Sequence, residues 1–215
     1  MMADQVRRLV VAVTGASGGH YAVRILQLLH AVPEYEVHLI ISSAGAVTLR
    51  QETGLKPTDL SALATTTYRN SDIGAAIASG SFPTSGMIVA PCSIRTLAAV
   101  TNCDTGTLIV RAADVCLKEG RPLLLMVRET PLHKGHLRLM SAAADAGAII
   151  APPMPAFYTR PASVAEIIDY TARRTLQRIG VPALAPNPWT GLHHEGAALP
   201  TGDSQPFPDR ESERA

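Results

Sequence analysis

Glycine and hydroxyl residues are concentrated at positions 14–19, where Thr-Gly-Ala-Ser-Gly-Gly directly follows an apolar run. Glycine allows a backbone to approach a ligand closely, and the first N–H groups of a helix that follows such a turn have no partner within the helix. Gly15, Ala16 and Ser17 therefore predict a phosphate site. The spacing differs from the dinucleotide motif G-x-G-x-x-G and lacks a Walker lysine, so a tight turn without a ligand is an equally good interpretation of this segment alone.

Hydroxyl residues also follow two further apolar runs. Ser42 ends the segment 36–42, and Ser93 and Thr96 follow the segment 86–90. Serine after a strand is ordinarily a turn residue or a helix cap. If the runs are parallel strands, however, their carboxyl ends meet at one edge of the sheet, and three such groups together favour a mononucleotide site.

Charged residues are densest on either side of a fourth apolar run, 122–127. Arg111, Lys118 and Arg128 could bind a second phosphate group, and the neighbouring cations would tune the protonation of Glu129. Lys118 and its charged neighbours are also typical of a solvated helix end. Arg128 and Glu129 fit that interpretation less well, because they directly follow the apolar run.

A proline-rich segment, 152–161, contains two aromatic residues. Its stiffness could place the Tyr158 hydroxyl accurately, whereas we expect Phe157 to pack as part of a connector. His133 and His136 would lie one helical turn apart, but no carboxylate or cysteine completes a metal-ligand spacing. We therefore expect all seven histidines to be surface residues and expect no metal site.

The pattern of apolar residues predicts strands that alternate with helices. Continuous apolar runs are typical of strands buried on both faces of a parallel sheet, and the segments between them have the apolar stripe of amphipathic helices. This order predicts a three-layer, doubly wound α/β fold with ligands at the carboxyl ends of its strands. The predicted strands are 9–13, 36–42, 86–90, 122–127 and 148–151, and the predicted helices are 21–30, 44–52, a segment that starts near Ser93, 133–146 and 163–179.

The composition changes near the C-terminus. The chain has 215 residues, of which 47% are hydrophobic, and this fits one domain better than two. Prolines and polar residues predominate in the last part, so we expect a single domain over 1–181 and a C-terminal arm with a disordered tail over 182–215. The exception is Trp189, which we expect to pack against something, such as a neighbouring subunit.

The charge balance excludes several classes of partner. Lysine and arginine total 19 against 18 acidic residues, which leaves no electrostatic footprint for nucleic acid or an anionic membrane. No apolar run has the length of a membrane span, and residues 1–6 lack the pattern of a signal peptide. We therefore expect a cytoplasmic protein, in which the three unevenly spaced cysteines are reduced thiols.

Taken together, these segments resemble the flavin prenyltransferases of the UbiX type, within the wider group of homo-oligomeric flavin-containing cysteine decarboxylases. The resemblance covers roughly residues 9–180, and the set of motifs is specific although each motif alone is weak. The matching segments are VTGASG at 13–18, ETG at 52–54, ASGS at 78–81, APCS at 90–93, RAADV at 111–115, LKE at 117–119, RETPL at 128–132 and PPMPAFY at 152–158.

The resemblance implies a flavodoxin-like subunit that binds FMN and acts without a metal. It implies that the dimethylallyl group of dimethylallyl phosphate, or of the diphosphate, is joined to N5 and C6 of reduced FMN. The prenylated FMN would then serve a partner decarboxylase of the UbiD type. The subunit would form a homo-oligomer, either a dodecamer or another trimer-based assembly, with its sites at subunit boundaries.

The resemblance also implies roles for individual residues. Ser17 and Glu52 would move protons near flavin N5, Lys118 would act on the departing phosphate, and Glu129 would assist at that step and when the second ring bond forms. The residues implied to hold FMN are Gly15, Ala16, Ser17, Ser42, Ser93, Thr96, Arg128 and, from a neighbouring subunit, Trp189. Those implied to hold the prenyl phosphate are Ser79, Gly80, Arg111, Lys118, Arg128, Tyr158 and Arg174.

Two alternatives remain open. A flavin-dependent cysteine decarboxylase of the same fold group is recognised by a Pro-Ala-Ser-Ala-Asn-Thr segment and an active histidine, whereas this chain has Pro-Cys-Ser-Ile-Arg-Thr at 91–96 and no histidine between His38 and His133. An FMN-binding accessory subunit of an aromatic-acid decarboxylase is the second alternative. The presence of Lys118, Glu129 and Tyr158 disfavours it, because a flavin carrier has no need of a second phosphate site.

Overall fold

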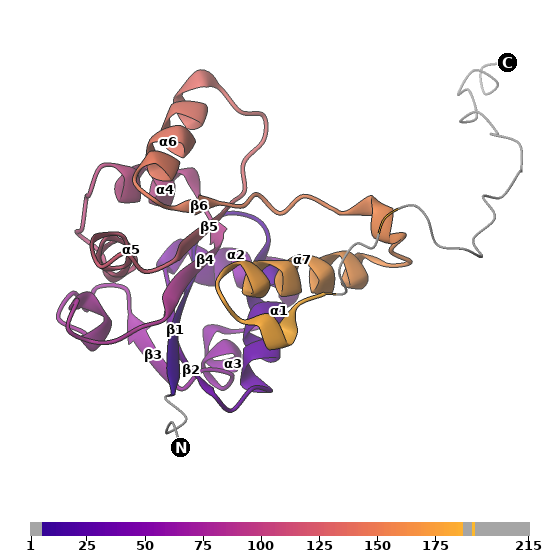
Figure 1. The fold of residues 1–215 in the computed structure, drawn as a ribbon, viewed down its shortest axis with the longest axis horizontal. Helices are drawn as coiled ribbons and strands as arrows, with labels where there is room; N and C mark the ends of the chain where they lie inside the picture. The colour runs from indigo at the N-terminus through magenta and orange to yellow at the C-terminus, as the bar shows by residue number, and fades with distance from the viewer. Residues whose placement is uncertain (1–5, 187–190, 192–215) are drawn as a thin grey trace, which may run out of the picture.

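Six parallel strands form one sheet in the computed structural model, which describes residues 6–186 and residue 191 (Figure 1). The strand order is β3-β2-β1-β4-β5-β6, so the chain leaves β1 on one side and returns to its other side at β4. In doubly wound folds such a reversal creates the ligand crevice at the carboxyl ends of the strands. The strands are β1 (Arg7–Val13), β2 (Tyr35–Ile41), β3 (Thr66–Arg69), β4 (Gly86–Cys92), β5 (Leu123–Val127) and β6 (Ile149–Ile150).

Helices cover both faces of this sheet (Figure 1). Successive β1 residues point to opposite faces: Val10 and Ala12 pack with α4, α5 and α6, whereas Leu9 and Val11 pack with α1, α2, α3 and α7. The predicted three-layer α/β class is therefore confirmed. The helices are α1 (Gly19–His30), α2 (Ser43–Thr53), α3 (Pro57–Ser61), α4 (Ile94–Thr101), α5 (Leu108–Lys118), α6 (Lys134–Asp145) and α7 (Val164–Arg178), with short 3₁₀ turns η1 (Ala76–Ala78), η2 (Phe157–Thr159) and η3 (Pro182–Leu184).

Two features of the sheet differ from the prediction. The edge strand β3 was not predicted, because its polar Thr-Thr-Tyr-Arg sequence lacks an apolar run. Pro91 does not stop the third predicted strand, since β4 continues to Cys92. The pairing of β4 with β5 shifts register between Val89 and Cys92, and such an irregularity accommodates a proline that has no N–H to donate.

The C-terminal part stays packed beyond the predicted boundary at residue 181. Val181 is buried, and Leu184 packs against the core beneath α1 and α7. Most of the predicted tail, including Trp189, lies outside the described residues. Among the helices that are described, none has both the length and the apolar character to cross a membrane.

An ion-pair network joins α7 to α1. The Asp169 carboxylate accepts hydrogen bonds from Nε of Arg24 and Nε of Arg173, each at 2.7 Å, and Nη2 of Arg24 lies 2.6 Å from Oδ1 of Asp169. Burial alone would raise the pKa of Asp169, but the two guanidinium groups outweigh it and hold the pKa below its ordinary value. The ionised form is therefore favoured by folding.

Stability should consequently depend on pH through Asp169. A carboxyl whose pKa is lower in the folded chain contributes stability above its unfolded pKa, about 3.9, and this contribution is lost as the pH falls through the folded value. We expect Asp169→Asn to lower the free energy of unfolding at pH 7 by about 1 kcal/mol or less, because the group is partly exposed.

Urea unfolding of the wild type and the variant at several pH values checks this expectation. The difference between them should narrow as the pH falls below about 4. Asp145→Asn, an exposed change at the end of α6, serves as the control. A difference that stays the same at all pH values would contradict the assignment to Asp169 ionisation.

Candidate functional site

The loops that follow β1, β2 and β4 meet at the carboxyl edge of the sheet. The Ser42 N–H donates to the Val13 carbonyl at 3.0 Å, and the Ser93 N–H donates to Oγ1 of Thr14 at 2.9 Å. The Thr14 hydroxyl in turn donates to the Pro91 carbonyl at 2.7 Å. The structure thus brings the hydroxyl residues after the three strands to one edge. We call Gly15, Ser17, Ser42, Glu52 and Ser93 the edge cluster.

The turn after β1 differs from the predicted phosphate cradle. Oε2 of Glu52 accepts hydrogen bonds from the Gly18 N–H at 2.9 Å and from the Gly19 N–H at 2.8 Å, so these two groups at the start of α1 already have an anionic partner. The expectation that the N–H groups at the start of this helix lack a partner is therefore wrong for Gly18 and Gly19. Phosphate binding by Gly15, Ala16 and Ser17 stays a prediction. Nothing in the sequence near Gly18 and Gly19 indicated that their partner would be a carboxylate more than thirty positions away.

Glu52 is held in its ionised form. Burial would raise its pKa, but a hydrogen bond from the Ser17 side chain, the two backbone N–H groups of Gly18 and Gly19, and the charge of His20 together lower the pKa below its ordinary value. The carboxylate also complements the positive end of the α1 dipole. Ser17 and Glu52, which were predicted to act as a pair, thus lie next to each other.

An anionic group at this edge would be bound beside α2 and α4. Ser42 and Ser93 cap these two helices: Oγ of Ser42 accepts from the Gly45 N–H at 3.0 Å, and Oγ of Ser93 accepts from the Thr96 N–H at 3.3 Å. The alternative interpretation of Ser42 and Ser93 as helix caps is therefore confirmed. Both serines and Thr96 are half-buried, and hydroxyl groups at helix starts are suited to an anion such as a phosphate.

Two glycines bring the turn and α2 into close contact. A methyl group at Gly15 would lie 2.6 Å from Cβ of Ala44, and one at Gly45 would lie 2.5 Å from the Val13 carbonyl oxygen. Gly15 was predicted to serve a ligand, and the structure shows that packing alone requires it. The structural roles of Gly45 and Thr14 were not predicted. In the sequence, Gly45 resembles an ordinary helix residue and Thr14 resembles part of a turn.

Arg128 and Glu129 follow β5 at the same edge of the sheet. The Arg128 N–H donates to the Cys92 carbonyl at 3.1 Å, and both side chains are exposed. Burial raises the pKa of Tyr21, at the start of α1, and the charge of Arg128 opposes this shift. The adjacent Cys92 thiol is buried, which raises its pKa to about 12 and makes it unsuitable as a nucleophile at neutral pH.

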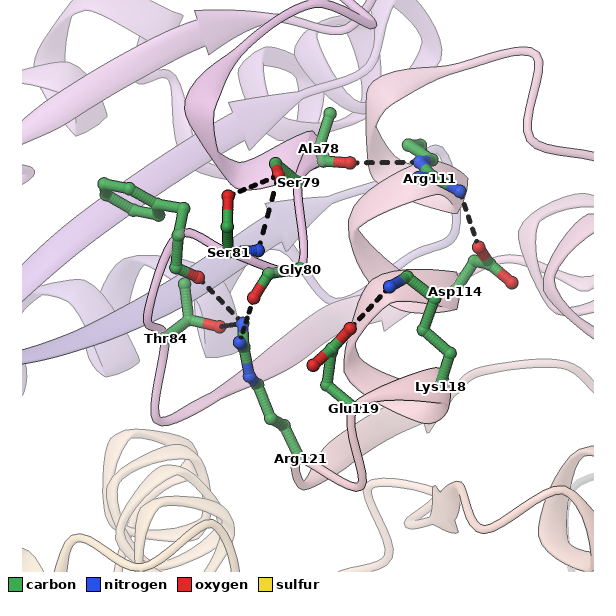
Figure 2. Close-up of polar contacts among 11 residues, drawn as sticks. Ala78, Ser79, Gly80, Ser81, Thr84, Arg111, Asp114, Lys118, Glu119 and Arg121 are labelled. Atoms are coloured by element: carbon green, nitrogen blue, oxygen red, sulfur yellow. Dashed lines mark hydrogen bonds and ion pairs between the residues drawn. The ribbon is translucent and has the colours of Figure 1, made fainter.

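A second group of predicted residues surrounds α5 (Figure 2). Nε of Arg111 donates to the Ala78 carbonyl at 3.0 Å and its Nη1 lies 2.9 Å from Asp114, while Nζ of Lys118 lies 2.5 Å from Oε1 of Glu119. The cations predicted to bind a phosphate are thus paired with carboxylates of their own segment. We call Ser79, Gly80, Arg111, Asp114, Lys118 and Glu119 the α5 cluster.

Arg121 holds the loop of the α5 cluster in place. Its guanidinium donates to the carbonyls of Gly80 at 2.5 Å and Phe82 at 2.9 Å and to the hydroxyl of Thr84 at 3.1 Å (Figure 2). Sequence reasoning missed this residue, since it was one of several charges in a run. An arginine with three donors on one loop is a structural anchor rather than a solvated charge.

The seven residues predicted to hold one phosphate are not together in a single chain. Lys118 and Gly80 lie toward the amino edge of the sheet, since α5 leads back to the start of β5 and the loop after Gly80 leads to the start of β4. Arg128 lies at the carboxyl edge. Arg174 is on α7, which covers the opposite face from α5. Within one copy, these residues therefore lie at different edges and faces of the sheet.

Tyr158 lies in the segment that extends from β6 to α7 (Figure 1). Its hydroxyl is hydrogen-bonded to that of Tyr170, one turn before Arg174 on α7. Phe157 is 71% exposed and Met154 is 75% exposed, so the expectation that Phe157 packs as a connector is wrong for this chain. Two exposed apolar side chains on an extended segment are typical of a surface that contacts another protein.

The prediction that all histidines are surface residues is wrong for His38, which is buried in β2. His133 and His136 lie at the start of α6. His133 is exposed and its Nδ1 accepts from the Gly135 N–H, whereas His136 is half-buried. Among the described residues, no three histidine, cysteine, aspartate or glutamate side chains are grouped so as to hold a metal ion.

Comparisons with known proteins agree with this geometry. A family described as Flavoprotein matches residues 2–174. The flavin prenyltransferase UbiX of Salmonella typhimurium is 50% identical over 176 residues, which cover 82% of this chain and 93% of that protein.

Two solved structures are also similar. The crystal structure of AnUbiX (PadA1) in complex with FMN and dimethylallyl pyrophosphate has a TM-score of 0.83 and 41% identity, and the match covers 87% of this chain and 99% of that chain. A dodecameric FMN-dependent UbiX-like decarboxylase from Escherichia coli O157:H7 has a TM-score of 0.82 and 43% identity, with coverage of 86% and 100%.

The Thr14 hydroxyl provides a test of how the edge cluster is held. Thr14→Val leaves the Ser93 N–H without its acceptor, and a buried unsatisfied donor costs about 1–3 kcal/mol. We expect the free energy of unfolding to fall by about this amount and FMN to bind more weakly, because Ser93 is no longer held beside the turn. Chemical denaturation and a flavin fluorescence titration measure the two effects.

Thr14→Ser is the matched control for that variant. It keeps the hydroxyl group, so we expect stability and FMN affinity close to those of the wild type. If Thr14→Val lost stability but bound FMN normally, Thr14 would support the fold without positioning the flavin loop.

Proposed function

The chain belongs to the flavoprotein family and, within it, to the UbiX-type flavin prenyltransferases, and we propose that it joins a dimethylallyl group to N5 and C6 of reduced FMN. The observation that carries this proposal is that Glu52 accepts the Gly18 and Gly19 N–H groups beside Ser17, at the edge where Ser42 and Ser93 lie. Reduced FMN supplies the nucleophilic atoms N5 and C6.

Ser17 and Glu52 act together on the N5 proton. The Ser17 hydroxyl donates to the Glu52 carboxylate, which leaves the serine oxygen able to accept a hydrogen bond from a ligand N–H. Because Glu52 also accepts two backbone N–H groups, its position is fixed and its charge persists at neutral pH. With reduced FMN bound, Ser17 would take up a proton from N5 and pass its own proton to Glu52.

The cationic residues act on the departing phosphate. Loss of phosphate from the allylic donor places positive charge on the prenyl group and negative charge on the leaving group. Arg111 and Lys118 stabilise that negative charge, and Glu129, exposed beside Arg128, exchanges a proton with the phosphate and later with the flavin. Positioning of the prenyl carbon against N5 supplies much of the remaining rate acceleration.

The phosphate site is completed by a second copy of the chain. This is supported by the separation of the α5 cluster from Arg128, Tyr158 and Arg174, and by the exposed apolar residues beside Tyr158. A homo-oligomer, dodecameric or otherwise trimer-based, would bring the α5 cluster of one copy to the edge cluster of another. Trp189 would contribute from a neighbouring copy in the same way.

A partner enzyme would use the product as its cofactor. Prenylated FMN is made for a decarboxylase of the UbiD type, which would receive it as a cofactor. A cytoplasmic location and a donor that is either the monophosphate or the diphosphate stay predictions. The accessory-subunit alternative is disfavoured by the contact of Ser17 with Glu52, because flavin storage needs no proton relay.

Incubation of the protein with reduced FMN and each prenyl donor tests the activity directly. We expect mass spectrometry to detect a flavin that is heavier by one five-carbon prenyl unit. Glu129→Gln should keep FMN bound, with its absorbance intact, but form the adduct about a hundredfold more slowly. If neither donor gives an adduct with the wild type, the proposed activity is wrong, and loss of FMN from Glu129→Gln would show that Glu129 has been misplaced.

The two-copy site has its own test. Co-expressed, differently tagged Lys118→Ala and Glu129→Gln chains should form mixed oligomers that recover about a quarter of wild-type activity, because random pairing joins an intact α5 cluster to an intact edge. Each variant alone should be nearly inactive. Mixed oligomers as inactive as the single variants would place Lys118 and Glu129 of each site in one chain.

A further inference from the structure

The Glu119 carboxylate lies over Gly80, in the space framed by Lys118 and the loop of Ser79. Its Oε1 is 2.5 Å from Nζ of Lys118, and a side chain at Gly80 would collide with the Glu119 carboxylate and lie 2.7 Å from Nζ of Lys118 (Figure 2). The groups that are expected to receive a phosphate oxygen thus already have an oxygen anion beside them. That anion belongs to the chain itself.

We propose that Glu119 is an internal counter-anion that occupies the place of a ligand oxygen beside Lys118 and determines selectivity against the more highly charged prenyl donor. This inference rests on the proposed function and adds a specificity-determining residue to it. A donor phosphate must displace the Glu119 carboxylate or bind close to it. Either way, the free energy of binding becomes less favourable as the charge of the donor increases.

The placement of Glu119 makes it ready to move. It is the C-cap of α5, where the helix dipole disfavours a negative charge. Its carboxylate is stabilised there by the hydrogen bond and charge of Lys118, and then by the charge of Arg121, which together lower its pKa. About a third of its side chain is exposed, so the carboxylate can turn into solvent when an anion takes its place.

The loop beneath Glu119 does not depend on this carboxylate. Arg121 holds the loop through the carbonyls of Gly80 and Phe82 and the hydroxyl of Thr84. Loss of the Glu119 charge therefore leaves the Gly80 loop in place but removes the internal competitor beside Lys118. This separation makes a selective test possible.

The charges of the α5 cluster and Arg121 explain the direction of the effect. Three cations and two carboxylates gather here, so their net charge is +1. They are Arg111, Lys118, Arg121, Asp114 and Glu119. Without the Glu119 charge, the net charge of this group becomes +2. A diphosphate carries about one more negative charge than a monophosphate at neutral pH and therefore gains more from this change.

The test compares dimethylallyl phosphate and dimethylallyl diphosphate as donors for the wild type, Glu119→Gln and Glu119→Asp. We expect Glu119→Gln to raise kcat/KM for the diphosphate relative to the monophosphate about three- to tenfold at low salt, and less at high salt. Glu119→Asp keeps the charge and should keep the wild-type ratio. Glu34→Gln, an exposed change of equal charge before β2, should leave the ratio unchanged.

Competitive binding of inorganic phosphate and pyrophosphate to the same variants gives a readout that does not require turnover. A selective gain for pyrophosphate in Glu119→Gln supports the proposal even if the wild type makes no prenyl adduct, a result that would overturn only the activity. If Glu119→Gln weakens both donors and both anions equally, Glu119 only positions Lys118 and the proposal is wrong. The proposal is also wrong if the ratio of kcat/KM for the diphosphate to that for the monophosphate is the same in every variant.

Discussion

The Glu52 carboxylate at the start of α1 determines how the rest of the edge cluster is arranged. It accepts the N–H groups of Gly18 and Gly19, so the positive end of α1 is neutralised from within the chain. An anionic ligand is therefore directed toward the starts of α2 and α4, where Ser42 and Ser93 lie. Because the same carboxylate binds the Ser17 hydroxyl, one anion both shapes the turn and fixes the orientation of a proposed proton carrier.

The α5 cluster follows the same principle at the other edge of the sheet. In both places a carboxylate of the chain stands beside groups that could bind an anion, but the burial and the hydrogen bonding differ. Glu52 has two backbone donors and a half-buried position, so it is a fixed part of the site. Glu119 is an exposed helix cap beside a lysine, so a stronger anion can replace it.

The sequence was sufficient to predict the layers of the fold, because apolar runs such as those of β1, β4 and β5, separated by amphipathic segments, are typical of a parallel sheet that is covered on both faces. It also predicted that Ser42 and Ser93 would meet at one edge, since the carboxyl ends of parallel strands must do so. The contact of Glu52 with Gly18 was not predictable, because it joins residues of two helices through tertiary packing. The polar edge strand β3 and the anchoring role of Arg121 likewise depend on partners that no local pattern specifies.

The close contacts of Gly15 and Gly45 limit how this site can change over evolutionary time. Even an alanine at either position would push the turn away from α2 or press α2 against the end of β1. Evolutionary changes in the shape of the edge cluster must therefore arise in α4 or in the extended segment that carries Tyr158. Lineages of this fold should accordingly diversify their donors through residues supplied by other elements and other copies, while the turn itself stays nearly fixed.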